Sequence, residues 1–428
     1  MRVFYSDYGT DPDRIARIEG FLARLKARGA AVCRTSRAPL DTVALNLPLP
    51  RTIVAPPAFS SGTPRHTPDR SDSLLTIAAT CFNYDYHLKT LEECAASILQ
   101  YQSYIHFEID NFQPSCVILW HQFNHYHYIV ADYCKARDIP VIYAENGVLP
   151  GSWCFEHGGQ MAESWIAGNP DGFAALPVSA QDRADARRYL DMAARSKLNR
   201  KTGGPGVREA GLAEALADDP RPTILYAGVN DIKTGLAPYS WRRSPRHAID
   251  YASSEAGLDA LLEVAGRRDW RILYKPHPGV KPGRGRAYAN DPHLLVIEKS
   301  VDLVDLLRHV DVLATILSQS AYMALINGVP CVLMGRMQLT GSGLAHEALR
   351  ETELEAAVEA ALADSGGDRA ALEAHVARLL RHYLVAPTMK PTPPFRYGLA
   401  DVADAVLAGP LRGRGGLGGL ASRLLRWV

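Results

Sequence analysis

The stretch VDVLATILSQSAYMALINGVPCVLMG, residues 310–335, contains the pattern that decides the fold class. Short apolar runs at 311–315 and 331–334 flank a helical pattern near 320–327. Polar residues such as Asp311 interrupt the stretch, so it indicates a strand, a helix and a strand in a core and not a membrane span. Such a unit predicts two parallel strands joined by a crossover helix.

Apolar runs of the same kind recur along the rest of the chain. They lie at residues 2–6, 116–120 and 140–145 in the first half, and at 223–227, 271–275 and 294–298 in the second half. Helical patterns separate most of them. Continuous apolar strands with crossover helices form parallel sheets that are buried on both faces. We therefore expect an α/β protein with two Rossmann-like doubly wound domains.

The boundary between the two domains is expected in a polar segment. Residues 197–222 are rich in Gly and Pro, which is typical of a hinge. We expect one domain at 1–205, a second at 206–385, and a C-terminal helix with a basic tail at 386–428. Two domains joined in this way would place a ligand in the cleft that faces the carboxyl ends of their strands.

Composition excludes several classes of protein. The 428 residues include 47 Lys and Arg against 46 Asp and Glu, a net charge of +1, and 47% of them are hydrophobic. These values indicate a folded chain and disfavour a nucleic-acid binder, which needs many cationic contacts to phosphate. The N-terminus lacks the apolar segment of a signal peptide, and the seven cysteines form no CxxC pair. We therefore expect a cytoplasmic protein that binds no nucleic acid.

The end of the chain has a basic character. Residues 409–428 contain four arginines and no acid. Gly413, Gly415 and Gly418 form a GxGxxG sequence, but no strand precedes it, so a dinucleotide-binding interpretation fails. From residue 417 onward the pattern fits a short amphipathic helix, which would make the protein peripheral on the inner membrane. A disordered basic tail fits the pattern equally well.

The motif YKPHP, residues 274–278, places a cation and an imidazole at the end of a predicted strand. Lys275 would supply charge to a bound anion, and His277 would supply a directional hydrogen bond to phosphate. Pro278 stiffens the turn. A rigid turn with a solvated lysine is the alternative interpretation.

Three polar residues, Ser318, Gln319 and Ser320, stand where the predicted helix of residues 320–327 begins. Their hydroxyl and backbone N–H groups can bind a phosphate or a carboxylate. The alternative is that the serines only cap the helix. The chain contains no Walker A sequence, which disfavours ATP hydrolysis.

Two acids also follow predicted strands. Glu145 lies in the segment YAENGV and suits general acid or base chemistry, with Asn146 and Gly147 as neighbouring substrate contacts. Asp231 follows the run at 223–227 and suits the role of a nucleophile or a base. Each acid has a structural alternative, because a carboxylate commonly organises the turn in which it lies.

Three histidines, His121, His125 and His127, lie close together in WHQFNHYHY. His121 and His125 have the i, i+4 spacing of a metal pair, but there is no HExxH glutamate and no evident third ligand. Histidines that line a cleft or support the fold are therefore favoured over a metal site.

Several of these segments, taken in order, resemble motifs of a known family. ENGVLPGSWCFEHGG, GVND, KPHP, and SQSAYMALINGVPCVLMG followed by GSGLAHE resemble the bacterial capsule polysaccharide biosynthesis proteins, a family that includes β-Kdo transferases. The resemblance covers about residues 115–347. It implies a GT-B-like glycosyltransferase that moves Kdo from the donor CMP-Kdo to a glycolipid or glycan acceptor, with no cofactor and no obligatory metal. Residues 1–205 would form the acceptor domain and residues 206–385 the nucleotide-sugar donor domain.

The resemblance also implies roles for single residues. Glu145 matches the functional acid of the family and Asp231 its candidate nucleophile. His277, Ser318 and Ser320 match the residues of the family that contact the CMP phosphate. Two positions depart from the pattern, because Asn146 stands where many members have a second acid, and Gly228 lies where a Gln is often found.

Three classes of function fit these observations. A Kdo-type glycosyltransferase is favoured. A sialyltransferase or a polyol-phosphate transferase with a related donor domain is the second class. A non-catalytic GT-B-like partner in a capsule assembly complex is the third.

Overall fold

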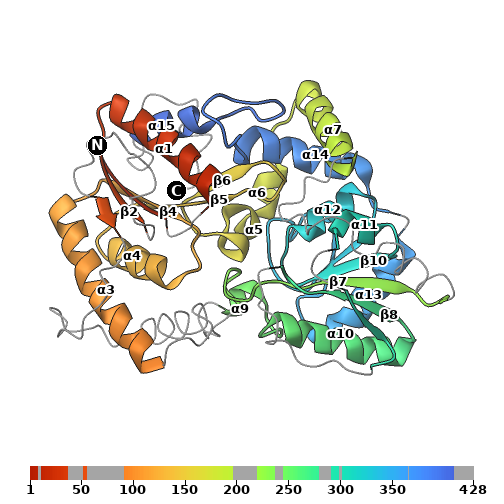
Figure 1. Ribbon diagram of the computed structural model, residues 1–428. Coiled ribbons are helices and arrows are strands. Elements are labelled where there is room, and N and C mark those ends of the chain that lie inside the picture. Colours follow the sequence, from red (N-terminus) through yellow and green to blue (C-terminus); the bar gives the residue numbers. More distant parts are fainter. Residues whose placement is uncertain are drawn as a thin grey trace. The chain divides into compact units, whose positions relative to one another are not determined.

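Two units, each built around one sheet, make up the chain (Figure 1). The computed structural model describes residues 1–7, 11–36, 52–54, 91–195, 219–236, 244–278, 291–297, 301–364 and 366–408. Unit 1 comprises residues 1–147, 152–160 and 381–428, and unit 2 comprises residues 148–151 and 161–380.

The sheet of unit 1 has six strands in the order β3-β2-β1-β4-β5-β6. The strands are β1 (Arg2–Asp7), β2 (Ala31–Ser36), β3 (Thr52–Val54), β4 (Cys116–Trp120), β5 (Val141–Asn146) and β6 (Trp153–Glu156). Neighbouring strands run parallel, except that β6 is antiparallel to β5. The central strands β1 and β4 are almost wholly buried, which explains their continuous apolar sequences.

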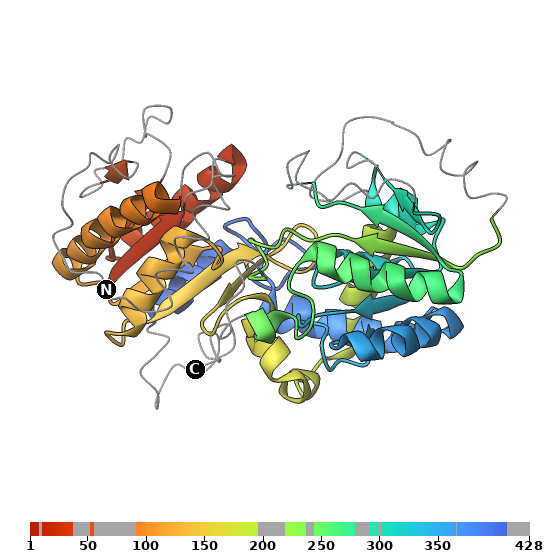
Figure 2. The same ribbon diagram turned by 90° about the horizontal axis from the view of Figure 1, so that it is seen from below.

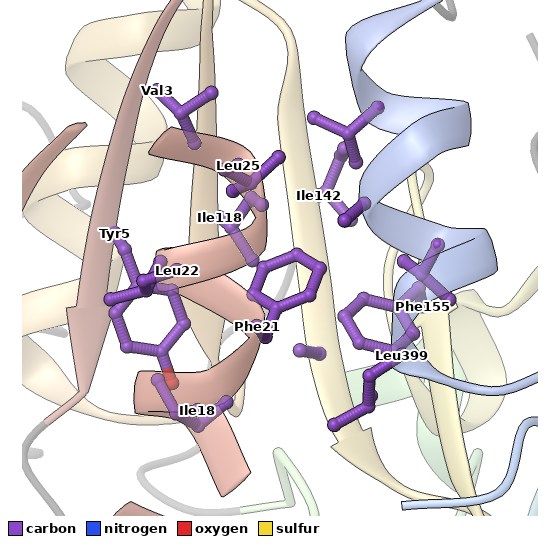
Figure 3. Packing of buried hydrophobic residues seen from close by; sticks show 14 of the residues in the cluster. Val3, Tyr5, Ile18, Phe21, Leu22, Leu25, Ile118, Ile142, Phe155 and Leu399 are labelled. Carbon is purple, nitrogen blue, oxygen red and sulfur yellow. The ribbon is translucent and has the colours of Figure 1, made fainter. Parts of the chain in front are cut away.

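Helices cover both faces of this sheet (Figures 1 and 2). They are α1 (Pro12–Ala27), α3 (Leu91–Phe112), α4 (His125–Lys135) and α15 (Leu399–Leu407). Helix α1 begins at a proline, and the Asp11 side chain accepts hydrogen bonds from the first free N–H groups. Phe21 of α1, Phe155 of β6 and Leu399 of α15 meet in the core between these helices and the sheet (Figure 3).

The sheet of unit 2 also has six strands, in the order β12-β11-β10-β7-β8-β9, and all of its strand pairs are parallel. The strands are β7 (Thr223–Ala227), β8 (Arg271–Lys275), β9 (Leu294–Val296), β10 (Val312–Thr315), β11 (Cys331–Leu333) and β12 (His346–Glu347). The longer helices are α7 (Ala180–Arg195), α10 (Ser254–Arg268), α13 (Leu354–Ala363) and α14 (Arg369–Arg378). The shorter ones are α5 (Trp165–Gly168), α6 (Pro170–Ala174), α9 (Ser244–His247), α11 (Leu303–Leu307) and α12 (Ser320–Ile326), with one-turn segments at Met161–Glu163 and Glu351–Glu353. A π-helical turn, Leu379–Tyr383, leads the chain from unit 2 back into unit 1.

Both sheets share one topology. Counted from the first strand of each unit, the spatial order is 3-2-1-4-5-6, which is the Rossmann order. The chain reverses its winding direction between β1 and β4 in unit 1 and between β7 and β10 in unit 2. The expected fold class, an α/β protein of two Rossmann-like units as in GT-B-like proteins, is confirmed.

The division of the chain differs from the expected boundaries at residues 205 and 385. Helix α7 was expected in the first domain, but its buried residues, among them Tyr189 and Leu190, pack within unit 2 against α14. The chain returns to unit 1 from residue 381 onward, where α15 packs beside α1. Local sequence shows that these helices are amphipathic but not which core their apolar faces join.

Two expectations lie outside the described residues, namely most of the hinge at 197–222 and the basic tail at 409–428. Among the helices of the described ranges, none is both long enough and apolar enough to cross a membrane.

Candidate functional site

The carboxyl ends of the central strands gather polar residues at one edge of unit 2. The register pairs Ala227 at the end of β7 with Lys275 at the end of β8. On the other side of β7, the Thr315 hydroxyl at the end of β10 donates a hydrogen bond of 2.8 Å to the Ala227 carbonyl. The segments that follow these strands therefore begin side by side at the point where Rossmann sheets bind ligands.

Lys275 and His277 both stand at this edge. Lys275 is the last residue of β8 and only 9% exposed. Burial lowers the pKa of Lys275, and the nearby Asp302 carboxylate partly opposes this shift. His277 is half-buried and Pro278 is exposed. A largely desolvated ammonium at a strand end does not fit the alternative of a solvated lysine on a rigid turn.

The three polar residues after β10 differ in what they bind. The Ser318 hydroxyl accepts a 3.2 Å hydrogen bond from the Ser320 N–H, so Ser318 caps the start of α12. The Gln319 side chain makes no capping bond. Ser320 is only 8% exposed, and its hydroxyl has no hydrogen-bond partner among the described residues. A buried hydroxyl of this kind is costly unless a ligand or water binds it, which favours the binding interpretation for Ser320.

Asp231 is bound to the start of α10. Its Oδ1 accepts a 2.8 Å hydrogen bond from the Ser254 N–H, while the Ser254 hydroxyl accepts one of 3.0 Å from the Val229 N–H. Burial raises the pKa of Asp231 to about 6, the Ser254 N–H opposes this shift, and the Glu255 charge adds to it. Oδ2 has no hydrogen-bond partner among the residues described. The carboxyl group therefore organises its turn and also offers one oxygen with a pKa suited to acid or base chemistry.

One cation at this edge was missed from the sequence. Arg336 follows β11 and is half-buried, and its backbone N–H donates a 2.7 Å hydrogen bond to the His247 carbonyl. Its guanidinium makes no hydrogen bond or ion pair with the described part of the chain. The only signal in the sequence is that Arg336 is the first charged residue after a buried strand, which is too common a pattern to single it out.

In unit 1, Glu145 and Asn146 are the last two residues of β5. The strand turns through Gly147 into the antiparallel β6, and the Gly147 N–H donates a 2.8 Å hydrogen bond to the Ser152 carbonyl. A Cβ atom at Gly147 would overlap the Ser152 hydroxyl and lie 2.6 Å from Leu384 Cδ2. The turn that follows Glu145 thus requires glycine for space.

Two histidines that follow β4, His121 and His127, differ in burial and in the groups that they contact. His127 is fully buried, and burial lowers its pKa to about 4. His121 lies 3.8 Å from Glu145, measured from Nδ1 to Oε1. The side chain of His125 is outside the described residues. Within the described ranges no group of three His, Cys, Asp or Glu side chains could hold a metal ion.

A charge pair at the end of β1 was also missed. Arg14 of α1 donates hydrogen bonds of 3.2 and 3.1 Å to both carboxylate oxygens of the buried Asp7. The Arg14 guanidinium also lies over the Trp120 ring, 4.9 Å from its centre. Because each charge is satisfied by the other, the pair supports the edge of the sheet and has no evident part in chemistry.

The structure thus assigns the expected site residues to two units. Unit 2 contains the residues expected to handle the donor, and each ends or follows a strand of its sheet: Asp231, Lys275, His277, Pro278, Ser318, Gln319 and Ser320. Unit 1 contains Glu145, Asn146 and Gly147. Both groups lie at or just after the carboxyl ends of strands, as expected.

Several solved structures share a general likeness with this chain. A beta Kdo 2,4 transferase of Thermosulfurimonas dismutans KpsC is 20% identical, with a TM-score of 0.47 over 69% of this chain and 87% of that one. The beta Kdo 2,7 transferase of the same KpsC is 13% identical, with a TM-score of 0.42 over 71% and 88%. A UDP-GlcNAc 2-epimerase of Methanocaldococcus jannaschii is 12% identical, with a TM-score of 0.36 over 89% and 99%.

Comparison of sequences gives a more specific result. No curated protein matches the chain. Residues 244–377 match the family model described as capsule polysaccharide biosynthesis protein. The matched segment includes the KPHP turn and the serines before α12. It confirms the family resemblance in this part of unit 2. The similarity of this chain to the capsule polysaccharide biosynthesis protein family thus extends over residues 244–377.

Proposed function

We propose that the chain is a glycosyltransferase of capsule or surface polysaccharide biosynthesis that transfers Kdo from CMP-Kdo to a glycolipid or glycan acceptor. The observation that supports it most directly is that Lys275, His277 and Ser320 end or follow strands at the carboxyl edge of unit 2. Two of these side chains are buried polar groups, and all three lie in the segment that matches the capsule family.

The donor chemistry suits these residues. In CMP-Kdo a single phosphate links the nucleoside to the sugar, so the leaving group is a monophosphate. Lys275 supplies positive charge to this phosphate, and His277 and Ser320 supply hydrogen bonds. Arg336 offers a second cation, suited to a carboxylate such as that of a 2-keto acid sugar.

The two acids take different parts of the reaction. Asp231 attacks the anomeric carbon through Oδ2 as the bond to the phosphate oxygen breaks, and CMP leaves with the electron pair of that bond. The acceptor oxygen then displaces Asp231, and the acceptor proton passes to the Glu145 carboxylate. The hydrogen bond from Ser254 to Oδ1 supports this role, because it fixes the carboxyl group and leaves the other oxygen available.

We further propose that the reaction needs no metal ion, because Lys275 and Arg336 supply the positive charge that stabilises a leaving monophosphate. EDTA should then leave turnover within about twofold of the untreated protein. Loss of turnover in EDTA, with recovery on addition of Mg²⁺, would reject the metal-free mechanism.

The experiment that tests the function is release of CMP from three donors offered in turn, CMP-Kdo, CMP-sialic acid and CDP-glycerol. CMP-Kdo should be consumed in the presence of a capsule glycolipid acceptor, and Lys275→Met should abolish this turnover. Lys390→Met, which removes an exposed lysine of unit 1, should leave it unchanged. Consumption of CMP-sialic acid or CDP-glycerol instead would establish one of the alternative transferases. No consumption of any donor would favour the non-catalytic assembly partner.

A further inference from the structure

His121 has a main-chain conformation that is unusual for its residue type. Its φ of 71° lies in the left-handed region, which side chains with a Cβ atom seldom adopt. The residue follows directly after β4, and its N–H donates a 2.8 Å hydrogen bond to the Ala144 carbonyl of β5. Such conformations persist where the surrounding structure holds them in place, and they are common in functional sites.

A buried chain of hydrogen bonds holds this conformation. His127 Nδ1 lies 2.6 Å from the His121 carbonyl oxygen, and His127 Nε2 lies 3.1 Å from the Ser6 hydroxyl. Nδ1 also lies 2.7 Å from Asn124 Nδ2, so the ring connects Ser6, Asn124 and the His121 carbonyl in one network. Because burial keeps the pKa of His127 near 4, the ring is neutral and this pattern is stable at neutral pH. The Asn124 amide donates a further hydrogen bond of 3.2 Å to the same carbonyl.

The result of this arrangement is contact between His121 and Glu145. The register pairs Trp120 with Ala144, so the residues that follow them, His121 and Glu145, also become neighbours. Their side chains are 17% and 16% exposed, and both ring nitrogens of His121 are buried. The Phe123 ring packs edge-on against the imidazole at 5.8 Å.

We propose that His121 is a positioning residue for Glu145, and that the two side chains act as one proton-handling pair at the edge of unit 1. This inference rests on the proposed role of Glu145. The imidazole lies 3.8 Å from one carboxylate oxygen and so limits the orientations of the group that would take the acceptor proton. Neither side chain would form this pair without the left-handed turn at His121.

Other charged groups lie on the elements beside β4. Asp7 of β1 and Arg14 of α1 form an ion pair through two hydrogen bonds, and His127 of α4 is neutral. Glu145 of β5 is the acid that lies 3.8 Å from His121, so its charge should influence the titration of His121.

Titration of His121 in the full chain by NMR tests the pair without any substrate. Replacement of Glu145 by Gln removes the neighbouring charge, so the midpoint of His121 should move down by about one pH unit. An unchanged midpoint for His121 in Glu145→Gln would overturn the pairing, whatever donor the protein uses.

A substitution to glycine separates positioning from folding. Glycine adopts a φ of 71° without strain, so His121→Gly should keep its Tm within about 3 °C of the native protein. It should lower kcat for transfer about tenfold or more and leave the KM for the donor unchanged, because the donor binds in unit 2. A native kcat and pH profile in this variant would overturn the proposal. If no donor is consumed by the native protein, the proposed function fails, and the NMR titration still decides the pair.

Discussion

The two serines at the start of α12 differ in whether the folded chain supplies a hydrogen-bond partner for the hydroxyl group. Ser318 already binds a backbone N–H, whereas the Ser320 hydroxyl, two residues later, is buried without a partner among the described residues. Since two serines in one motif are chemically equivalent, only the structure separates the capping residue from the binding residue. A separate observation concerns Lys275, whose pKa is lowered by burial, because burial of an ammonium opposes folding.

Replacement of His277 by Ala tests the KPHP turn as a phosphate site. Loss of one charge-assisted hydrogen bond costs about 1.5–3 kcal/mol, so kcat/KM should fall about 10- to 150-fold. Steady-state rates of CMP release measure the change. His309→Ala is the matched control, because His309 precedes β10 and so lies toward the amino end of that strand. Equal rates in the two variants would show that KPHP only ends a strand.

Replacement of Asp231 by Asn should change stability and activity in opposite directions. Burial raises the pKa of Asp231 from its ordinary 3.8 to about 6, so ionisation of this group opposes folding as the pH rises through that interval. Asn accepts the same Ser254 N–H and carries no charge. The variant should therefore be more stable at pH 7 by about 1–3 kcal/mol and should lose transfer activity.

Urea unfolding at several pH values measures this difference between Asp231→Asn and the native protein. Below about pH 3 the Asp231 side chain is neutral in both the folded and the unfolded chain, so the two stabilities should converge. The gain should grow up to about pH 6 and then remain constant. A variant that is less stable at every pH would show that the carboxylate serves mainly to hold α10.

At the scale of elements, the hairpin of β5 and β6 depends on close packing at its turn. Gly147→Ala would force a methyl group against the Ser152 hydroxyl and Leu384, which costs about 1–3 kcal/mol in a packed site. Thermal unfolding should detect the loss, and kcat should fall with it because Glu145 lies on the same strand. Gly168→Ala, where a Cβ atom meets nothing within 4 Å, should leave both unchanged. Equal effects in the two variants would contradict the packing argument.

The sequence was sufficient to predict most strands, because buried parallel strands are continuous apolar runs. The runs at 116–120, 223–227 and 271–275 coincide with β4, β7 and β8. It was also sufficient to place the candidate site residues at strand ends. It was not sufficient to predict the pairing of His121 with Glu145, because that contact depends on the register between β4 and β5. Local patterns do not encode such a register.

At the scale of the whole molecule, local sequence patterns also do not show in which unit a helix packs. Helix α7 lies within the first expected domain in sequence but packs in unit 2. Helix α15 lies near the C-terminal end of the sequence but packs in unit 1. Their amphipathic patterns are clear, but the partner of an apolar face is decided by long-range packing. The chain therefore passes between its two units several times, and the units are not independent segments of sequence.

This division of the chain leads to a prediction about how the two acids share the reaction. Glu145 lies in unit 1 and Asp231 in unit 2, so their loss should stop different steps. Glu145→Gln should retain donor binding and release of CMP in a first turnover, but should slow transfer to the acceptor by about 10²–10⁴-fold. Mass spectrometry of this variant with donor alone should reveal a Kdo adduct on Asp231. Asp231→Asn should bind donor and form no adduct. Near-normal transfer in both variants would place the chemistry on other residues, whereas an adduct on a different side chain would retain the transferase and replace its nucleophile.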